Sequence, residues 1–417
     1  MKFKRFVKGK IHALRFLLAC LFFRPIAVVM PRNPKKIIFG AWWGRQFGDN
    51  PKYFMKFLLA QNAGYQCYWV GEEYLRGKIA AECPEVKFIR KGSQILKWHL
   101  LTAKWAFFCL SMKSDISSFP TFGKVRLLSM WHGTRIKGVG NMDLNRPEPT
   151  GTDLRARIKR FLYELDRKHV VTSCDASFSS SLMVEHQPLY LPWQFTKERS
   201  INAGTAKIDF LIQNAKNAPL ISKLREKYAK LLGLPTDKKW YLYMPTWRNK
   251  LDLKYSFTIS SLRGQFDDLV AKQNAIIIEK QHPQVIYSLD IKESHTGNIH
   301  MVSNEAMPDI DVQELLLCAQ RLVSDYSSVV CDFECMGRPV IQFVYDYDDY
   351  ANDDCGFEYD FEEIAAGPLV RTEKELLSAL EMTDDQLLSL KGPKWRDPIN
   401  GENGHACETF ARHVGLI

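Results

Sequence analysis

The stretch RLVSDYSSVVCDFECM, residues 321–336, indicates the class of fold more clearly than any other part of the 417-residue sequence. Its first four residues, with Leu322 and Val323 at their centre, predict a short buried strand, and residues 329–336 have the composition of a helix. Asp325-Tyr326-Ser327-Ser328 joins the two as a turn rich in hydroxyl groups. A strand that turns directly into a helix is the repeating unit of α/β proteins with parallel sheets.

This turn has two interpretations. Ser and Asp side chains commonly cap the first turn of a helix, where each is worth about 1 kcal/mol. The same geometry directs unpaired backbone N–H groups and the positive end of the helix dipole toward a bound anion. With the side chains of Asp325, Ser327 and Ser328 added, a diphosphate is the ligand that the turn suits best.

Apolar runs alternate with helical patterns along the rest of the chain. Strands are predicted at 36–42, 65–70, 105–110, 125–130, 169–172, 240–244, 275–280, 299–302, 321–324 and 340–344. Helices are predicted at 51–61, with Asn50 as N-cap, and at 219–232, 259–272, 311–318 and 373–381.

Two such blocks predict an α/β fold of two Rossmann-like, doubly wound domains that face each other across a cleft. We expect a leader at residues 1–33, an N-terminal domain at 34–203, a C-terminal domain at 204–400 and a final helix at 401–417.

The positive charge of the chain is local. Residues 1–36 contain ten Lys or Arg and no acidic residue, and the first acid is Asp49. The whole chain has 57 basic and 47 acidic residues, so this segment accounts for the net charge of +10. The remainder is neutral on balance, which argues against a protein that coats nucleic acid.

Read as a helix, residues 3–22 place apolar side chains on one face and basic ones on the other. The longest apolar run has eight residues, 16–23, whereas a spanning helix needs about 20. A signal peptide lacks support because Pro-Arg-Asn-Pro follows in place of a small-residue cleavage site. A solvated basic tail does not explain the apolar face. We therefore expect an amphipathic helix on an anionic membrane surface, and a peripheral protein at the cytoplasmic face.

The ten cysteines are scattered, mostly in apolar runs, and no CxxC pair occurs. This usage is typical of reduced, buried cysteine in a cytosolic compartment. We expect no metal site. The sequence contains no Gly-rich loop of the ATP-binding or dinucleotide-binding type, and we expect no cofactor.

Polar residues at the carboxyl ends of parallel strands are candidate site residues, because ligands bind at that edge. His132 follows the strand predicted at 125–130 and precedes Gly133-Thr134. A structural histidine in a loop is the common alternative. At the edge of a cleft, however, an imidazole is a credible general base.

Three further groups stand at comparable positions. Arg248, in Pro245-Thr246-Trp247-Arg248, is either a phosphate ligand or an exposed side chain after a proline turn. His282 precedes Pro283, which ends the strand and directs the imidazole toward the same cleft. Glu314, in a helix capped by Asp311, is placed to meet a ribose diol.

Several motifs follow one another in the order seen in the CDP-glycerol glycerophosphotransferases, and the chain resembles that family from about residue 39 to its C-terminus. They are Asp49-Asn50-Pro51, Trp131-His132-Gly133-Thr134, Pro245-Thr246-Trp247-Arg248, His282-Pro283, Asp325-Tyr326-Ser327-Ser328, Asp332-Phe333, Gly337-Arg338-Pro339-Val340-Ile341 and Gly356-Phe357-Glu358-Tyr359-Asp360-Phe361. The resemblance implies a GT-B fold with an N-terminal acceptor domain and a C-terminal nucleotide domain. It also implies transfer of glycerol phosphate from CDP-glycerol to a hydroxyl of a membrane-anchored acceptor, in teichoic acid or capsule synthesis.

The resemblance assigns roles to individual residues. His132 is similar to the family's proposed base, and His282 to a residue that stabilises the donor diphosphate. The implied substrate-binding residues are Gly133, Thr134, Thr246, Arg248, Glu314, Asp325, Ser327 and Ser328.

The chain departs from the family pattern at two places. Arg135 stands where the family often has proline after His-Gly-Thr. The Gly-Tyr-Pro-Arg-Asn-Asp stretch of the family is represented here by 204–209, in which Lys207 takes the place of the arginine charge.

Three alternatives remain open on the sequence. One is a ribitol-phosphate transferase that uses CDP-ribitol, and another is a GT-B transferase that uses a nucleotide sugar. The third is a catalytically silent, membrane-associated binding protein of a polymer-assembly complex.

Overall fold

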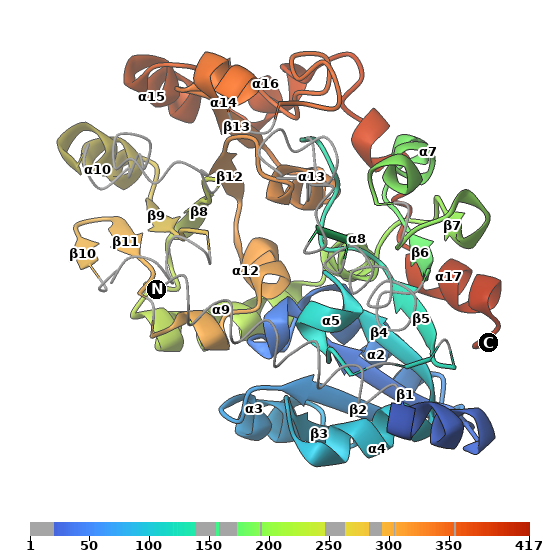
Figure 1. Cartoon of the computed structure of the whole chain (residues 1–417). Coiled ribbons are helices and arrows are strands. Elements are labelled where there is room, and N and C mark those ends of the chain that lie inside the picture. The colour runs from blue at the N-terminus through green and yellow to red at the C-terminus, as the bar shows by residue number, and fades with distance from the viewer. Residues whose placement is uncertain are drawn as a thin grey trace.

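The structure is a computed structural model of the chain. It describes residues 21–119, 121–122, 124–137, 156–157, 173–191, 194–246, 263–282, 294–303, 305–353 and 356–417. Two seven-stranded sheets organise these residues (Figure 1).

The first sheet has the strand order β3-β2-β1-β4-β5-β6-β7, and every neighbouring pair is parallel. Its strands are β1 Asn33–Gly40, β2 Gln66–Gly71, β3 Lys87–Arg90, β4 Ala103–Phe108, β5 Arg126–Ser129, β6 Asp175–Ser177 and β7 Ser200–Ile201. The chain begins in the middle of the sheet and adds strands in both directions, which is the doubly wound order.

The second sheet repeats this plan with the order β10-β11-β9-β8-β12-β13-β14. Its strands are β8 Lys239–Tyr243, β9 Ala275–Glu279, β10 Ser294–Thr296, β11 Ile299–Met301, β12 Arg321–Ser324, β13 Val340–Phe343 and β14 Leu369–Val370. Only the edge pair β10–β11 is antiparallel. The prediction of two parallel-sheet blocks is therefore confirmed.

Helices cover the sheets and form the contacts between them. They are α2 Asp49–Ala60, α3 Leu75–Glu82, α4 Gln94–Thr102, α5 Met112–Asp115, α7 Ser181–Tyr190, α8 Ala206–Asn214, α9 Ala218–Leu232, α10 Arg263–Lys272, α12 Val312–Cys318, α13 Val329–Glu334, α14 Tyr347–Asp353, α15 Glu373–Glu381, α16 Asp384–Ser389 and α17 Ala406–Val414. Helix α2 of the first unit packs against α8, and α8 also contacts α12 and α13 beside the second sheet.

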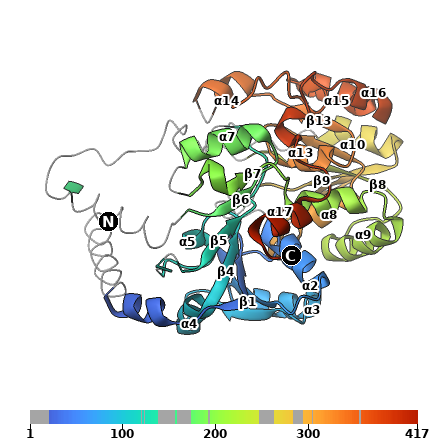
Figure 2. The same cartoon turned by 90° about the vertical axis from the view of Figure 1, so that its right-hand side faces the viewer.

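The last helix, α17, returns to the first sheet. It lies against α8 and β6 (Figure 2), and Phe410 is fully buried in the same core as Phe54 and Phe107. Arg126 donates a hydrogen bond to the carbonyl of Val414 at 2.7 Å. The C-terminal segment thus closes the layer over the N-terminal sheet.

Most predicted strands and helices lie within a few residues of the observed ones, and residues 321–324 coincide with β12. The strand predicted at 169–172 lies outside the described residues, and the short strands β3, β6, β7, β10 and β14 were not predicted. The assignment of Asn50 as an N-cap is wrong. Helix α2 begins at Asp49. The side-chain amide of Asn50 instead donates hydrogen bonds to the carbonyls of Met130 and Trp131, just after β5.

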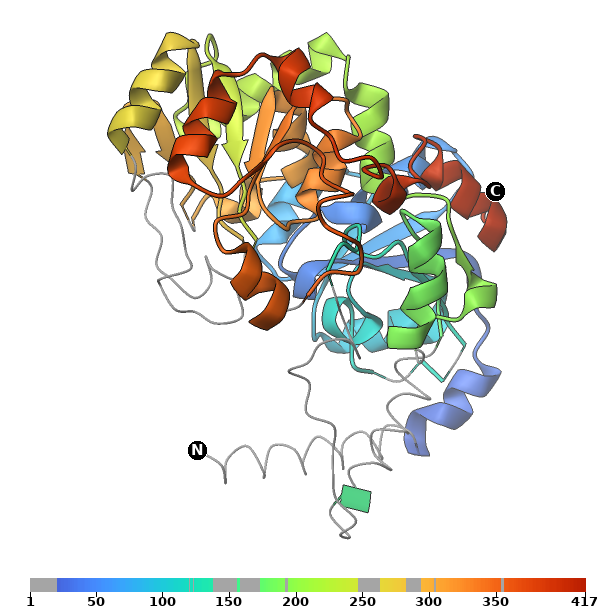
Figure 3. The same cartoon turned by 90° about the horizontal axis from the view of Figure 1, so that it is seen from above.

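The predicted leader is described only from residue 21. Residues 21–29 are helical and lie at the outer edge of the first unit (Figure 3). Ala27 is buried against that unit, whereas Leu21 and Phe22 are 71% and 68% exposed. In the described part of the chain, no helix is long and apolar enough to cross a membrane.

Candidate active site

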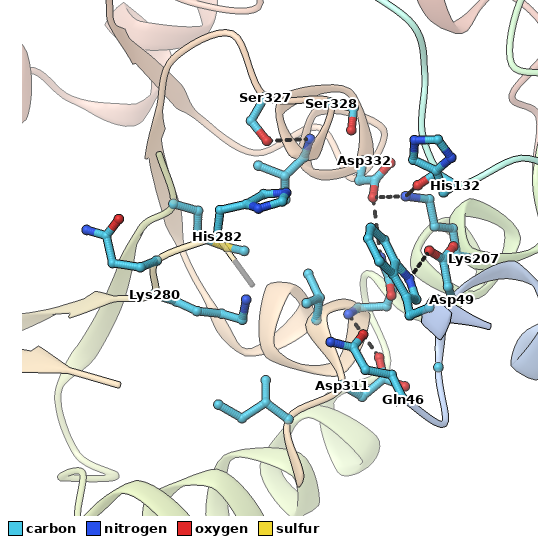
Figure 4. Close-up of a pocket in the computed structure, with 18 of the residues that line it drawn as sticks. Gln46, Asp49, His132, Lys207, Lys280, His282, Asp311, Ser327, Ser328 and Asp332 are labelled. Carbon is cyan, nitrogen blue, oxygen red and sulfur yellow. Dashed lines mark hydrogen bonds and ion pairs between the residues drawn. The ribbon is translucent and has the colours of Figure 1, made fainter. Parts of the chain in front are cut away.

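A cavity of about 350 Å³ lies where the carboxyl ends of strands from both sheets meet. Five predicted site residues line it: His132, Thr246, His282, Ser327 and Ser328. Each follows the end of a strand, because the crossover helices start from this edge. In Figure 4, His282, Ser327 and Lys280 lie on one side of the cavity, and His132, Lys207 and Asp49 lie on the other.

His132 stands in the loop after β5, directly behind Trp131. The backbone of Trp131 is left-handed, with φ of 55°, and this bend turns the next side chain toward the cavity. The imidazole packs against Trp131 and Trp42, with ring centroids 4.5 Å and 5.9 Å away. Its Nδ1 atom is buried and has no hydrogen-bond partner among the described residues.

The environment keeps His132 neutral. Burial lowers its pKa to about 3, and the nearby charges of Lys207 and Lys137 act in the same direction. A neutral imidazole with an open lone pair at Nδ1 accepts protons and cannot donate one from that atom.

Two side chains from outside β5 hold the His132 loop. The Asn50 amide donates hydrogen bonds to the carbonyls of Met130 at 3.0 Å and Trp131 at 2.8 Å. Lys207 Nζ donates to the His132 carbonyl at 3.2 Å, and its backbone N–H donates to Asn50 Oδ1 at 2.9 Å. The loop is therefore fixed through its backbone. The imidazole has a hydrogen bond with the backbone of Cys109, and Nδ1 is its ring nitrogen without a partner among the described residues.

Lys207 also joins the two halves of the site. Its ammonium group lies 2.6 Å from Asp332 Oδ2 in α13. Burial opposes its charge, but Asp332 and Asp49 outweigh burial and raise the pKa of Lys207. The lysine at this position is thus a buried cation that holds the backbone of the His132 loop.

Asp49 is the carboxylate of the N-terminal wall. It accepts hydrogen bonds from Trp42 Nε1 at 2.6 Å and from the Asn50 N–H at 2.7 Å. Burial nevertheless raises its pKa to about 6, against the opposing effect of Lys207. Its backbone has φ of 60°, and Trp42 and Trp43 are also left-handed. Such a run of strained non-glycine residues is common at functional sites.

The opposite wall carries His282, Ser327 and Ser328. Burial, followed by the charges of Lys137 and Lys280, lowers the pKa of His282 to about 3. The two serines form the turn before α13, and Ser327 Oγ accepts a hydrogen bond from the Val329 N–H at 3.4 Å.

Gly133 is the point of closest approach between the walls. A Cβ atom added there would lie 2.5 Å from Ser328 Oγ. Gly133, predicted as substrate-binding, therefore allows the His132 loop to approach the turn formed by Ser327 and Ser328.

Three other predicted residues support the site from outside the cavity. The Asp325 carboxylate accepts the backbone N–H of Thr246 at 2.8 Å and 3.1 Å, which aligns the turn after β8. Thr134 Oγ1 is hydrogen-bonded to Ser179 Oγ at 3.0 Å. Glu314 is buried and accepts hydrogen bonds from Tyr228 at 2.9 Å and Lys227 at 2.6 Å. Arg248 lies outside the described residues.

Arg135, the departure from the family's proline, has a partner of its own. It forms a buried salt bridge with Glu358, and Glu358 also contacts His186 Nδ1 at 2.8 Å. Residue 137 forms a β-bridge with residue 357 close by. The arginine thereby ties the His132 loop to the 356–361 segment.

Sequence reasoning missed Lys280 and underrated Asp49 and Asp332. All three line the cavity. Asp49 and Asp332 stand in family motifs, which was the available signal. Lys280 stands two residues before His282, and no motif marked it.

Two mainly parallel sheets with a cavity at the carboxyl ends of their strands are an architecture shared by many nucleotide-binding α/β enzymes. Within that class, the family model for CDP-Glycerol:Poly(glycerophosphate) glycerophosphotransferase matches residues 22–391. The chain belongs to this family.

Curated relatives agree along most of the chain. A teichoic acid poly(glycerol phosphate) polymerase of Bacillus spizizenii is 28% identical over 90% of each protein. A teichoic acid glycerol-phosphate transferase of Staphylococcus aureus is 25% identical over 85% of each. A teichoic acid poly(ribitol-phosphate) polymerase of B. spizizenii is 30% identical, but only over 44% of this chain and 28% of the relative.

Solved structures share the fold. A solved structure of the wall teichoic acid polymerase TagF, a histidine-to-alanine variant, superposes with a TM-score of 0.73 at 20% identity, over 100% of this chain and 96% of the solved chain. The α/β fold of this chain is thus TagF-like.

Proposed function

We propose that this protein is a CDP-glycerol glycerophosphotransferase, which transfers glycerol phosphate from CDP-glycerol to an acceptor hydroxyl and releases CMP. The observation that carries the proposal is the cavity itself. It sets His132, whose buried Nδ1 has no hydrogen-bond partner among the described residues, on one wall opposite His282, Ser327 and Ser328 on the other. A base thus faces a group of anion ligands.

The reaction follows from these positions. The acceptor oxygen attacks the phosphorus that carries glycerol, and its proton passes to His132 Nδ1. The bond from that phosphorus to the CMP phosphate oxygen breaks, and CMP leaves with the bonding pair. Positioning and charge neutralisation supply most of the catalysis in transfers of this type.

The low pKa of His132 in the free protein does not oppose this role. Burial is the main cause of the low pKa, and the charges of Lys207 and Lys137 add to it. A bound diphosphate brings negative charge next to the imidazole and opposes both effects. The pKa then moves back toward the range in which a general base is effective. His282 and the two serines stabilise the diphosphate, together with Arg248, which stays a predicted ligand.

The proposed domain arrangement is of the GT-B type. Residues 34–203 form the acceptor domain and residues 204–400 form the donor domain, while the segment 401–417 packs back on the first. Trp42 and Trp43 line the acceptor side of the cavity. Glu314 and Thr134 are proposed to support substrate binding indirectly. Glu314 fixes α12 through Tyr228 and Lys227, and Thr134 fixes the loop after β5 through Ser179.

The donor is proposed to be CDP-glycerol rather than CDP-ribitol. Four relatives named for glycerol phosphate match 84% to 90% of the chain and a fifth, a glycerol-phosphate primase, matches 54%, whereas the ribitol-phosphate relatives match 44% to 47%. The product is proposed to be a teichoic acid, with a phosphopolyol capsule as the alternative.

The acceptor is proposed to be lipid-linked, and the protein to work as a peripheral enzyme at the cytoplasmic face of the membrane. Ten basic residues without an acid in segment 1–36 support attraction to anionic lipid. The exposed Leu21, Phe22, Val28 and Val29 add an apolar surface beside them.

A donor assay tests the function. Purified protein is incubated with CDP-glycerol, CDP-ribitol or UDP-sugars in the presence of a lipid-linked acceptor. We expect CMP release and a glycerol-phosphate product from CDP-glycerol alone. Release of UDP, or turnover of CDP-ribitol in preference to CDP-glycerol, contradicts the proposal.

A further inference from the structure

Lys280 is a buried lysine that extends into the cavity from the end of β9. Its backbone N–H donates to the Tyr243 carbonyl at 2.9 Å, which continues the pairing of β9 with β8. The residue is 3% exposed, and the ammonium group points into the cavity (Figure 4).

Other buried lysines of the described chain show what is unusual about it. Lys52 lies 2.7 Å from Asp311 and 2.6 Å from Glu82, and Lys207 lies 2.6 Å from Asp332. Within the described residues, no carboxylate forms an ion pair with Lys280, and burial alone lowers its pKa, to about 8. Buried charges are normally paired because desolvation costs several kcal/mol.

The surroundings of Lys280 do not supply the missing charge. The carboxylates that line the cavity are engaged elsewhere: Asp311 by Lys52, Asp332 by Lys207, and Asp49 by Trp42. The groups near Lys280 are His282 on its own strand end and Lys137 from the opposite wall. Burial is the main cause of the low pKa of His282, and both lysines lower it further, so their positive charges act on this end of the cavity.

We propose that Lys280 Nζ is a direct ligand of the donor diphosphate, where it binds a non-bridging phosphate oxygen between His282 and the Ser327–Ser328 turn. This inference rests on the proposed function. Lys280 is held desolvated in the free protein, and donor binding supplies its counter-charge. A lysine used in this way reduces the stability of the free protein in exchange for affinity, which is common at functional sites.

The test compares three variants by calorimetric titration with CDP-glycerol at pH 7. Lys280→Met keeps the volume and removes the charge, and we expect its Kd to rise about tenfold or more, as for loss of one charged hydrogen bond. Lys280→Arg should recover part of the affinity. Lys239→Met, at the exposed start of the neighbouring strand β8, is the matched control and should stay within about twofold of wild type.

The melting temperature of the ligand-free variants shows whether Lys280 serves to bind the donor or to support the fold. Since Lys280→Met removes an unpaired buried charge, the free variant should melt at or above the wild-type temperature while it binds donor less tightly. Unchanged donor affinity overturns the inference. Weaker binding together with a lower melting temperature also overturns it, because the lysine then supports the fold.

Inorganic pyrophosphate distinguishes failure of this inference from failure of the proposed function. If CDP-glycerol is not turned over but wild-type protein binds pyrophosphate and Lys280→Met does not, the anion site stands and the assigned donor is wrong. If wild type binds neither CDP-glycerol nor pyrophosphate, both proposals fall.

Discussion

Lys207 Nζ lies 2.6 Å from Asp332 Oδ2, and the same ammonium group holds the backbone carbonyl of His132 at 3.2 Å. One buried cation therefore connects α13, beside the second sheet, to the His132 loop on the first. The pair contacts the backbone of His132 and not its imidazole, as expected of a pair that positions the proposed base.

Lys207→Met should reduce both stability and turnover. It leaves the buried Asp332 without its cation, and loss of one partner of a buried pair costs about 3–5 kcal/mol. We expect the free energy of unfolding to fall by that order and kcat to fall more than donor affinity. Denaturant unfolding and steady-state kinetics measure the two effects.

Two further variants sharpen this prediction. Lys216→Met, at an exposed position just beyond α8, should leave both quantities unchanged. In Lys207→Met with Asp332→Asn, the orphaned charge is gone, so stability should recover while kcat stays low. If kcat recovers together with stability, the pair acts only on the fold.

His132→Ala should abolish transfer while CDP-glycerol still binds. A general base contributes about 10²–10⁴-fold to rate, and His132 is placed on the acceptor wall rather than at the serine turn. We expect kcat to fall by that factor and the donor Kd to change little. His413→Ala, on the exposed face of α17, is the control. Near-normal turnover in His132→Ala would rule out this base.

The pKa of His132 and His282, lowered to about 3 in the free protein, predicts that neither titrates near 6.5. Imidazole NMR signals assigned with His132→Ala and His282→Ala should stay unchanged from pH 8 to pH 5. Addition of CDP-glycerol should raise both pKa values, because the diphosphate is negative. An ordinary histidine titration in the free protein contradicts the structure.

The same shift has a consequence for stability. Between the unfolded pKa of about 6.5 and the folded pKa, the unfolded chain binds a proton that the native protein excludes, so stability falls as pH falls. Asp49, with a pKa raised to about 6, acts in the opposite direction between about pH 4 and 6. The contribution of His132 is therefore measured as the difference in free energy of unfolding between wild type and His132→Gln. As pH falls, the free energy of unfolding of His132→Gln should decrease less than that of wild type, by about 1 kcal/mol per pH unit.

The sequence was sufficient to predict the sheets because buried parallel strands are continuous apolar runs, and β8 and β9 contain such runs. Short strands such as β7, with two residues, carry no pattern of their own. Asn50 shows a second limit. An Asn beside a helix start predicts a cap from local chemistry, but its partners, the carbonyls of Met130 and Trp131, are eighty residues away.

The site was predictable where a residue follows a strand, as His132 and His282 do. Lys280 and the Lys207–Asp332 pair were not predictable from spacing, because their roles depend on which charges burial brings together. Glu314 illustrates the reverse case. Its place after the Asp311 cap suggested a ribose ligand, yet its carboxylate is held by Tyr228 and Lys227, and its contact with the donor stays a prediction.

Deletion of residues 1–24 should release the protein from anionic membranes. The deleted segment contains seven of the ten leading basic residues and the exposed Leu21 and Phe22, and each basic residue near the surface is worth about 1 kcal/mol. We expect the full chain to sediment with phosphatidylglycerol vesicles and the shortened chain to stay in solution. Neutral phosphatidylcholine vesicles are the control. Continued sedimentation of the shortened chain with anionic vesicles would place the anchor elsewhere.

Gly133→Ala tests whether the two walls must meet at the serine turn. The added Cβ would lie 2.5 Å from Ser328 Oγ and 3.1 Å from Ser328 Cβ, so either the serine side chain or the His132 loop has to move. We expect donor affinity to fall about tenfold, since a displaced hydroxyl loses its hydrogen bond to the donor. The double variant Gly133→Ala with Ser328→Gly removes the obstructing side chain. The double variant loses the Ser328 hydroxyl but keeps the close approach of the two walls, so its turnover should equal that of Ser328→Gly alone. Gly133→Ala loses both, so its turnover should be lower than that of the double variant. A Gly133→Ala enzyme with wild-type donor affinity would show that the walls separate when the donor binds.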